Sequence, residues 1–259
     1  MAALCFSLLL LTSSANSFYY PRVPPRDFQR GDPLDVKVNK LSSENTRLRY
    51  NYYDLRYCQP PQIKNNAETL LETLWELIRG DHIQNSMYTF NMMEEQPCTI
   101  LCALDLDAKY ANDFKEKIAD EYRVNLILDN LPVVVRRNYA GSKEVKYFIY
   151  NHLSFRVMFH KHLANDSAQI VGFEVTPYSI NHKYKEFPHL TTCYKHTNET
   201  FLRNAIPQEV DARKKIIFTY DVSFMESDIK WESRWDHLPK NGQSKTSITK
   251  TAMMNVAWP

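Results

Sequence analysis

The chain has 259 residues, and 44% of them are hydrophobic, which is enough to bury the core of one large domain or two ordinary ones. Its 32 Lys and Arg residues nearly balance its 30 Asp and Glu residues, so the formal net charge is only +2 at pH 7. This composition excludes a chain that is disordered throughout, and it gives no charge field that favours nucleic acid or anionic lipid as the main partner.

The N-terminus has the pattern of a secretory signal peptide over residues 1–17. An apolar run from Ala2 to Leu11 is followed by small residues, and Ala15 and Ser17 suit a cleavage site before Phe18. A short buried N-terminal helix is the alternative. A run of about ten apolar residues is too short to cross a bilayer, and no run of about eighteen follows it. We therefore expect a soluble mature chain in the lumen of the secretory pathway or outside the cell.

The first elements after a proline-rich opening are two strands and a helix. Strands are predicted around Leu34 to Val38 and within LRYNYYDLRY, residues 48–57. Asn65 and Glu68 form a capping box, and Gly80 is placed to end the helix that follows. The apolar residues of this helix recur on one face: Leu70, Leu71, Leu74, Leu77 and Ile78.

A second helix is predicted over Ala108 to Tyr122, and strands dominate the rest of the chain. VNLIL leads to a turn at DNLP, and VKYFIYNHLSFRVMFHKHL and QIVGFEVTPYSI have the pattern of a hairpin. In IIFTYDVSF, apolar residues alternate from Ile216 to Phe224, which predicts a strand with one buried face. The expected fold is mainly β (α+β), an antiparallel β-sandwich-like luminal domain with two helices.

Four cysteines remain after removal of the signal: Cys58, Cys98, Cys102 and Cys193. An even number in an oxidising compartment favours two disulfides over the alternative of four unpaired buried thiols. CTILC is β-like, and in a strand its two cysteines lie about 13 Å apart, beyond disulfide reach. We therefore expect Cys58 and Cys193 each to pair with one member of CTILC, in either arrangement.

Two sequons suit the same compartment, NDS at Asn165 and NET at Asn198. Each lies in a polar stretch between apolar runs, where a loop could carry a glycan. We expect both asparagines to be glycosylated.

The C-terminal stretch DIKWESRWDHL suggests an interaction surface of Trp231, Arg234 and Trp235. The tryptophans are four apart and share a face in a helical turn, so they could form a carbohydrate platform, although docking onto the β core is the more common arrangement. The nearby acids could include a glycosidase pair, but their spacing selects none and favours a solvated segment. These acids are Asp221, Glu226, Asp228, Glu232 and Asp236.

His160 and His162 could share a strand face as metal ligands or as luminal pH sensors, although exposed strand histidines are the commoner case. No third ligand is identifiable, and the chain has no GxSxG, HExxH, CxxC or phosphate-loop motif. We therefore expect no catalytic, cofactor or metal site.

Several phrases, in order from Phe18 to Leu238, resemble the luminal N-terminal region of the nonaspanins, the transmembrane-nine superfamily. They are FYYPRVPPRDFQRGDPLDVKVNKL, YYDLRYCQP, LIRGDHIQNSMYTF, CTILC, KEKIADEYRVNLILDNLP, YNHLSFRV, QIVGFEVTPYSI, PQEV and FTYDVSFMESDIKWESRWDHL. The resemblance implies a luminal domain over residues 18–238 and a divergent tail over 239–259 in place of the membrane domain. It also implies that a luminal segment is missing between DNLPVVVRRN and YAGSKEVKYF.

The resemblance further implies a non-enzymatic protein of Golgi and endosomal compartments that takes part in sorting and trafficking of membrane proteins. Its expected partners are membrane-protein cargo or other luminal proteins, with no cofactor and no nucleic acid. The truncated form is expected in the lumen or secreted. The alternative from the residues alone is a secreted carbohydrate-binding or carbohydrate-processing β protein that uses Trp231 and Trp235.

Overall fold

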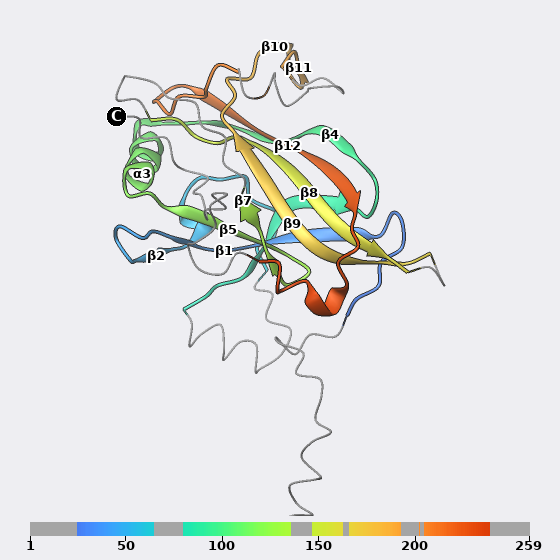
Figure 1. The fold of residues 1–259 in the computed structure, drawn as a ribbon. Helices are drawn as coiled ribbons and strands as arrows, with labels where there is room; N and C mark the ends of the chain where they lie inside the picture. The colour runs from blue at the N-terminus through green and yellow to red at the C-terminus, as the bar shows by residue number, and fades with distance from the viewer. Residues whose placement is uncertain are drawn as a thin grey trace, which may run out of the picture.

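Two sheets face each other across one apolar core in the computed structural model (Figure 1). The structure describes residues 25–64, 80–135, 147–162, 166–192, 202 and 205–238. The first sheet is built around β1, with β2 and β3 along one edge of this strand and β5 along the other, followed by β6. Its strands are β1 (Pro33–Ser42), β2 (Arg49–Tyr50), β3 (Gln84–Asn91), β5 (Arg123–Leu128) and β6 (Leu131–Pro132).

The second sheet has the strand order β4, β12, β8, β9 and β7. Its strands are β4 (Gln96–Asp105), β12 (Lys215–Glu226), β8 (His152–Lys161), β9 (Ala168–Tyr178) and β7 (Val134–Val135). The predicted β8–β9 hairpin is confirmed, but β12 runs parallel to β8 and β7 runs parallel to β9. The sheet is therefore mixed, because alternation along a strand reports which face is buried and not the direction of the neighbouring strand.

The two sheets meet through aromatic side chains. The ring of Tyr88 on β3 lies 5.4 Å from that of Phe155 on β8 and 5.5 Å from that of Tyr220 on β12, in edge-to-face arrangements. The predicted inner face of β8 is confirmed, since Leu153, Phe155, Val157 and Phe159 are all buried. The mainly β sandwich expected from the sequence is therefore the observed architecture.

The helix α3 (Ala108–Ala119) lies at the end of the sandwich (Figure 1). Asp107 caps it by accepting a hydrogen bond from the backbone N–H of Tyr110, and the predicted apolar residues Ala111, Phe114 and Ile118 are buried. The other predicted helix, over residues 65–79, lies outside the described residues. Gly80, which was expected to end it, has φ of +69°, a conformation that suits glycine.

Two local predictions differ from the structure, and one strand was not expected. The stretch LRYNYYDLRY forms only the short strand β2 and then the 3₁₀ turn η1 (Tyr52–Asp54), because Tyr52 turns inward and stacks on Tyr57 at 4.6 Å. Strand β3 was not predicted. In β12, Ile217 and Thr219 are as buried as the predicted inner face, since both faces of this central strand are covered there.

The outer face of the second sheet is covered at one end by the segment that follows β9. This segment contains the hairpin of β10 (Tyr184–Glu186) and β11 (His189–Leu190), which Figure 1 shows beyond the second sheet, on the side away from β1. A second apolar cluster contains Tyr178 of β9, Ile180 of the covering segment and Leu202, with Ala205 packed against them.

Candidate functional site

A disulfide joins Cys58 to Cys102, with their Cα atoms 5.8 Å apart. This confirms that Cys58 pairs with a member of CTILC, which lies on β4 as predicted. Cys98 is also disulfide-bonded, and its partner lies outside the described residues because Cys58 and Cys102 bond each other. The pairing of Cys98 with Cys193 stays a prediction.

Trp231 and Arg234 do not form the predicted interaction surface, because both are buried. Arg234 is only 1% exposed, and its guanidinium donates to the Asp129 carboxylate at 2.6 Å and to the backbone oxygen of Ile170 at 2.8 Å. The guanidinium also lies over the rings of Trp231 and Trp235, 4.4 Å and 5.8 Å from their centroids.

Since Asp129 follows β5 and Ile170 belongs to β9, Arg234 ties the C-terminal 3₁₀ turn η2 (Trp231–Ser233) to both sheets. The structure therefore shows the segment of Trp231 and Trp235 docked onto the β core, which was the commoner alternative to a carbohydrate platform. Burial raises the pKa of the Asp129 carboxyl, and the contact with Arg234 acts in the opposite direction.

The remaining residues considered as ligands or catalysts do not converge on one site in the described part of the chain. The imidazole of His160 contacts the backbone oxygen of Ser227 at 2.9 Å, and that of His162 lies 3.6 Å from the Asp27 carboxylate. No group of three or more His, Cys, Asp or Glu residues among those described is placed to hold a metal ion. Asn165 and Asn198 lie outside the described residues.

A row of hydrogen-bonded side chains crosses the outer face of the second sheet. We call it the histidine–threonine chain, and it contains Asp221 and Thr219 on β12, His152 on β8, and His182 and Thr192 beside the β10–β11 hairpin. His152 lies 3.2 Å from the Asp221 carboxylate and 2.8 Å from the Thr219 hydroxyl. His182 lies 2.9 Å from the same hydroxyl and 2.8 Å from that of Thr192.

The order carboxylate, imidazole, hydroxyl is also the order of a nucleophilic triad, but the geometry does not suit that chemistry. Thr219 is only 1% exposed, and its oxygen is shared by two imidazoles, so no substrate can approach it. Burial, together with the neighbouring His152, lowers the pKa of His182 from 6.5 to about 3. The histidine–threonine chain therefore acts as a structural link between β12, β8 and the covering segment.

Asn151, immediately before β8, completes this link. Its side chain donates to the backbone oxygens of Ile180 and Ile217 and accepts from the N–H of Ile180, each at 2.8 Å. No signal in the sequence identified Asn151, His152 and His182, because the first two lie far along the chain from His182 and from Thr219, and their partners depend on the strand order.

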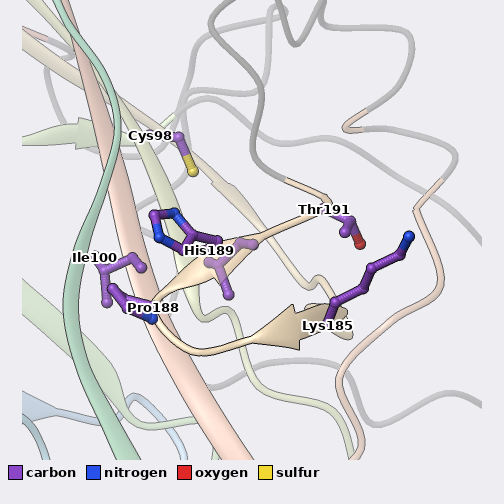
Figure 2. Close-up of a pocket in the computed structure, with 7 residues that line it drawn as sticks. Cys98, Ile100, Lys185, Pro188, His189 and Thr191 are labelled. Carbon is purple, nitrogen blue, oxygen red and sulfur yellow. The ribbon is translucent and has the colours of Figure 1, made fainter.

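A pocket of about 460 Å³ lies between β4 and the hairpin. Figure 2 shows Ile100 of β4 close to Pro188 and His189, with Lys185 and Thr191 at the other end. The pocket also borders Cys98 and Leu190. Its walls are mainly apolar, with the ammonium group of Lys185 and the imidazole of His189 among the lining groups.

The family model described as Endomembrane protein 70 matches residues 49–258. The chain belongs to this family, the transmembrane 9 or nonaspanin family. The match covers most of the predicted luminal domain and continues past Leu238 into the predicted tail.

Among the relatives, transmembrane 9 superfamily members 8 and 9 of Arabidopsis thaliana are 48% and 49% identical, over 90% and 88% of this chain and 40% and 39% of their own length. Transmembrane 9 superfamily member 4 of Homo sapiens is 34% identical over 90% of this nonaspanin chain and 40% of its own length. The chain thus spans about two fifths of these relatives. No solved structure matches it significantly. Within the described part of the nonaspanin chain, no helix is long and apolar enough to cross a membrane.

Proposed function

We propose that this chain is the luminal part of a nonaspanin and binds membrane-protein cargo or other luminal proteins during sorting in Golgi and endosomal compartments. The family match carries this proposal. The role is one of binding and not of catalysis. The contacts of the candidate acidic and histidine residues support it. In the described structure His152 and Asp221 belong to a hydrogen-bonded link, and His160 and His162 contact the Ser227 backbone oxygen and the Asp27 carboxylate.

The β10–β11 hairpin is the part of the described surface best suited to a protein partner. Tyr184 and Phe187 are 41% and 47% exposed, and their rings lie 6.0 Å apart in an edge-to-face arrangement. Exposed aromatic side chains are characteristic of protein interfaces, where they bury large areas at low entropic cost. The adjacent pocket offers a place for a partner side chain.

The sorting role can be tested in a chimera of a full-length relative, such as Arabidopsis transmembrane 9 superfamily member 8, that carries this chain in place of its own matching segment. Cells that lack the relative are scored for delivery of their membrane proteins to the correct compartment. We expect the chimera to restore delivery and the double variant Tyr184→Ala/Phe187→Ala to fail at equal protein level. Met225→Ala, which removes an exposed apolar side chain on β12, is the matched control. Restoration by the hairpin variant would contradict the role of the hairpin.

The alternative of a carbohydrate-binding protein is weakened by the burial of Trp231 and by the packing of Arg234 against both tryptophans. A glycan-binding screen of the wild-type chain and of Trp235→Ala tests it directly. Glycan binding that is lost on replacement of Trp235 would favour this alternative over the sorting role.

A further inference from the structure

The hydrogen bonds of the histidine–threonine chain have a single direction when His152 is neutral. A carboxylate can only accept, so His152 carries its proton on Nε2 and donates it to Asp221. The Nδ1 atom of this neutral imidazole must then accept, and its partner is the hydroxyl of Thr219 at 2.8 Å. The proton of Thr219 is therefore directed toward His152.

The same reasoning continues to the hairpin. Since the Thr219 proton is used, its oxygen accepts from Nε2–H of His182 at 2.9 Å. The Nδ1 atom of His182 accepts from the Thr192 hydroxyl at 2.8 Å, and the Thr192 oxygen accepts from the backbone N–H of Lys183 at 3.3 Å. With both imidazoles neutral, each therefore has one defined tautomer.

These bonds hold the base of the hairpin on the second sheet. His182 precedes β10 and Thr192 follows β11, so the imidazole of His182 joins the two ends of the hairpin to Thr219 on β12. The ends are also joined to each other, because the backbone N–H and the hydroxyl of Thr191 both donate to the Lys183 oxygen, at 2.7 Å and 2.9 Å.

A second proton on His182 is unfavourable in this arrangement. It would make Nδ1 a donor, so the Thr192 hydroxyl, which donates to it in the neutral form, would have to turn and accept instead. It would also place a positive charge on a side chain that is 7% exposed and whose ring centroid lies 6.4 Å from that of His152.

The surrounding elements do not compensate this charge in the described structure. The Asp221 carboxylate on β12 contacts His152, on the far side from His182. β9 presents the phenol ring of Tyr178, 6.1 Å from the ring of His152, and β4 presents Ile100 opposite Thr219. Burial and His152 accordingly hold the pKa of His182 near 3 in the closed hairpin.

We propose that the histidine–threonine chain is an acid-sensitive latch: it holds the β10–β11 hairpin on the second sheet while His182 is neutral and releases the hairpin when acidification protonates His182. The hairpin carries the exposed rings of Tyr184 and Phe187, so release changes how this aromatic pair is presented. The latch rests on the hydrogen-bond geometry and does not depend on the proposed sorting role.

The size of the effect follows from the protonation of the open form. If His182 has its ordinary pKa of 6.5 once the hairpin opens, the open population rises about tenfold for each pH unit below that value. Between about pH 7.4 and about pH 5 the open population should rise about 30-fold.

Hydrogen exchange followed by mass spectrometry on the secreted full chain, with its disulfides intact, tests the latch at these two pH values. After correction for intrinsic exchange chemistry, we expect protection in peptides covering residues 180–192 to fall about 30-fold at the lower pH. Peptides from β1 and β5 should change much less. The glutamine in His182→Gln does not titrate, so the hairpin of this variant should show no such pH response. His189→Gln, which replaces an exposed histidine on the same hairpin, should respond like the wild type.

The latch is refuted if wild-type protection at the hairpin is the same at both pH values, if the response persists in His182→Gln, or if it disappears in His189→Gln. If His182→Gln does not fold, imidazole NMR of the wild type decides the question. We then expect the ring signals of the closed form to stay those of a neutral Nε2–H tautomer down to about pH 5. A His182 signal that titrates near 6.5 while the hairpin remains protected would overturn the proposal.

Discussion

Arg234 illustrates how a charged residue in a polar stretch becomes part of the core. Two exposed acids, Glu232 and Asp236, lie two residues away on either side, yet its guanidinium is buried against two tryptophan rings, a carboxylate and a backbone carbonyl. A planar guanidinium can satisfy all of these partners at once, whereas a lysine ammonium cannot. At the residue scale, the C-terminal segment is therefore anchored by one side chain that contacts both sheets.

Replacement of Arg234 by Met should lower the free energy of unfolding by about 3–5 kcal/mol, because it leaves the buried Asp129 carboxylate without its partner. Urea denaturation followed by tryptophan fluorescence measures this loss. Lys230→Met, at an exposed position of the same segment, should change the stability by less than about 0.5 kcal/mol. A loss for Arg234→Met as small as that of the control would show that the ion pair does not anchor the segment.

Asn151 is the second residue whose removal should be costly. Asn151→Ala leaves three buried backbone groups, on Ile180 and Ile217, without their side-chain partner, at about 1–3 kcal/mol for each unsatisfied group. We expect a loss of at least about 3 kcal/mol in chemical denaturation. Asn181→Ala removes an exposed amide nearby and should be close to neutral. Equal effects of the two variants would contradict the role assigned to Asn151.

At the scale of the elements, β12 joins the two parts of the second sheet. It pairs with β4 in the antiparallel direction and with β8 in the parallel direction, so it lies inside the sheet and has a neighbour on each edge. Its first half is covered on the inner face by Tyr88 and Phe90 of β3 and on the outer face by the segment that contains His182. This double cover explains why Ile217 and Thr219 are buried against the expectation of one buried face.

The Cys58–Cys102 disulfide should stabilise this arrangement by fixing the segment after η1 to β4. The two cysteines are 44 residues apart, and removing a bridge across a loop of that size typically costs about 2–4 kcal/mol. The double variant Cys58→Ser/Cys102→Ser should therefore unfold at a clearly lower denaturant concentration. Non-reducing peptide mapping of the wild type should show this bridge together with one between Cys98 and Cys193. Recovery of a Cys98–Cys102 bridge instead would contradict both pairings.

For the whole molecule, the buried His182 makes stability depend on pH. Its pKa is lowered from 6.5 to about 3, so the stability that it contributes is fully present above 6.5 and is lost as the pH falls toward 3. Between about pH 7.4 and about pH 5 this single group should lower the free energy of unfolding by about 2 kcal/mol. Burial raises the pKa of Asp129 above its ordinary value of 3.8, so this carboxyl lowers the stability of the folded chain as the pH rises above 3.8, opposite to His182. Urea titrations at both pH values should show a smaller loss of unfolding free energy for His182→Gln than for the wild type. Equal losses would show that His182 is not the source of the pH dependence.

Entry of the chain into the secretory pathway is tested by its sequons. If residues 1–17 act as a signal peptide, Asn165 and Asn198 should carry glycans when the chain is made in eukaryotic cells. Endoglycosidase should then lower the apparent mass in two steps, and each Asn→Gln variant should lose one of them. The absence of any shift would remove the luminal assignment and leave the sorting proposal without its compartment.

Much of the local structure follows from the sequence alone. The inner face of β8, the hairpin with β9, the buried stripe of α3, the β-strand at CTILC and the class of the fold could all be read from residues close together in the chain. Side-chain periodicity is a local property: it states which residues share a face, and it needs no knowledge of the neighbouring element. The family could also be identified from the sequence, because its phrases follow one another in order.

The tertiary structure alone decided which distant residues meet. The parallel pairing of β12 with β8 brings Thr219 beside His152, and the path of the segment after β9 then brings His182 to the same hydroxyl. It likewise buried Trp231 and Arg234, which the sequence presents as a polar surface segment. The free energy of these contacts depends on the order of the strands and on the removal of water from both faces of the sheet, and neither is encoded in the spacing of residues along one strand.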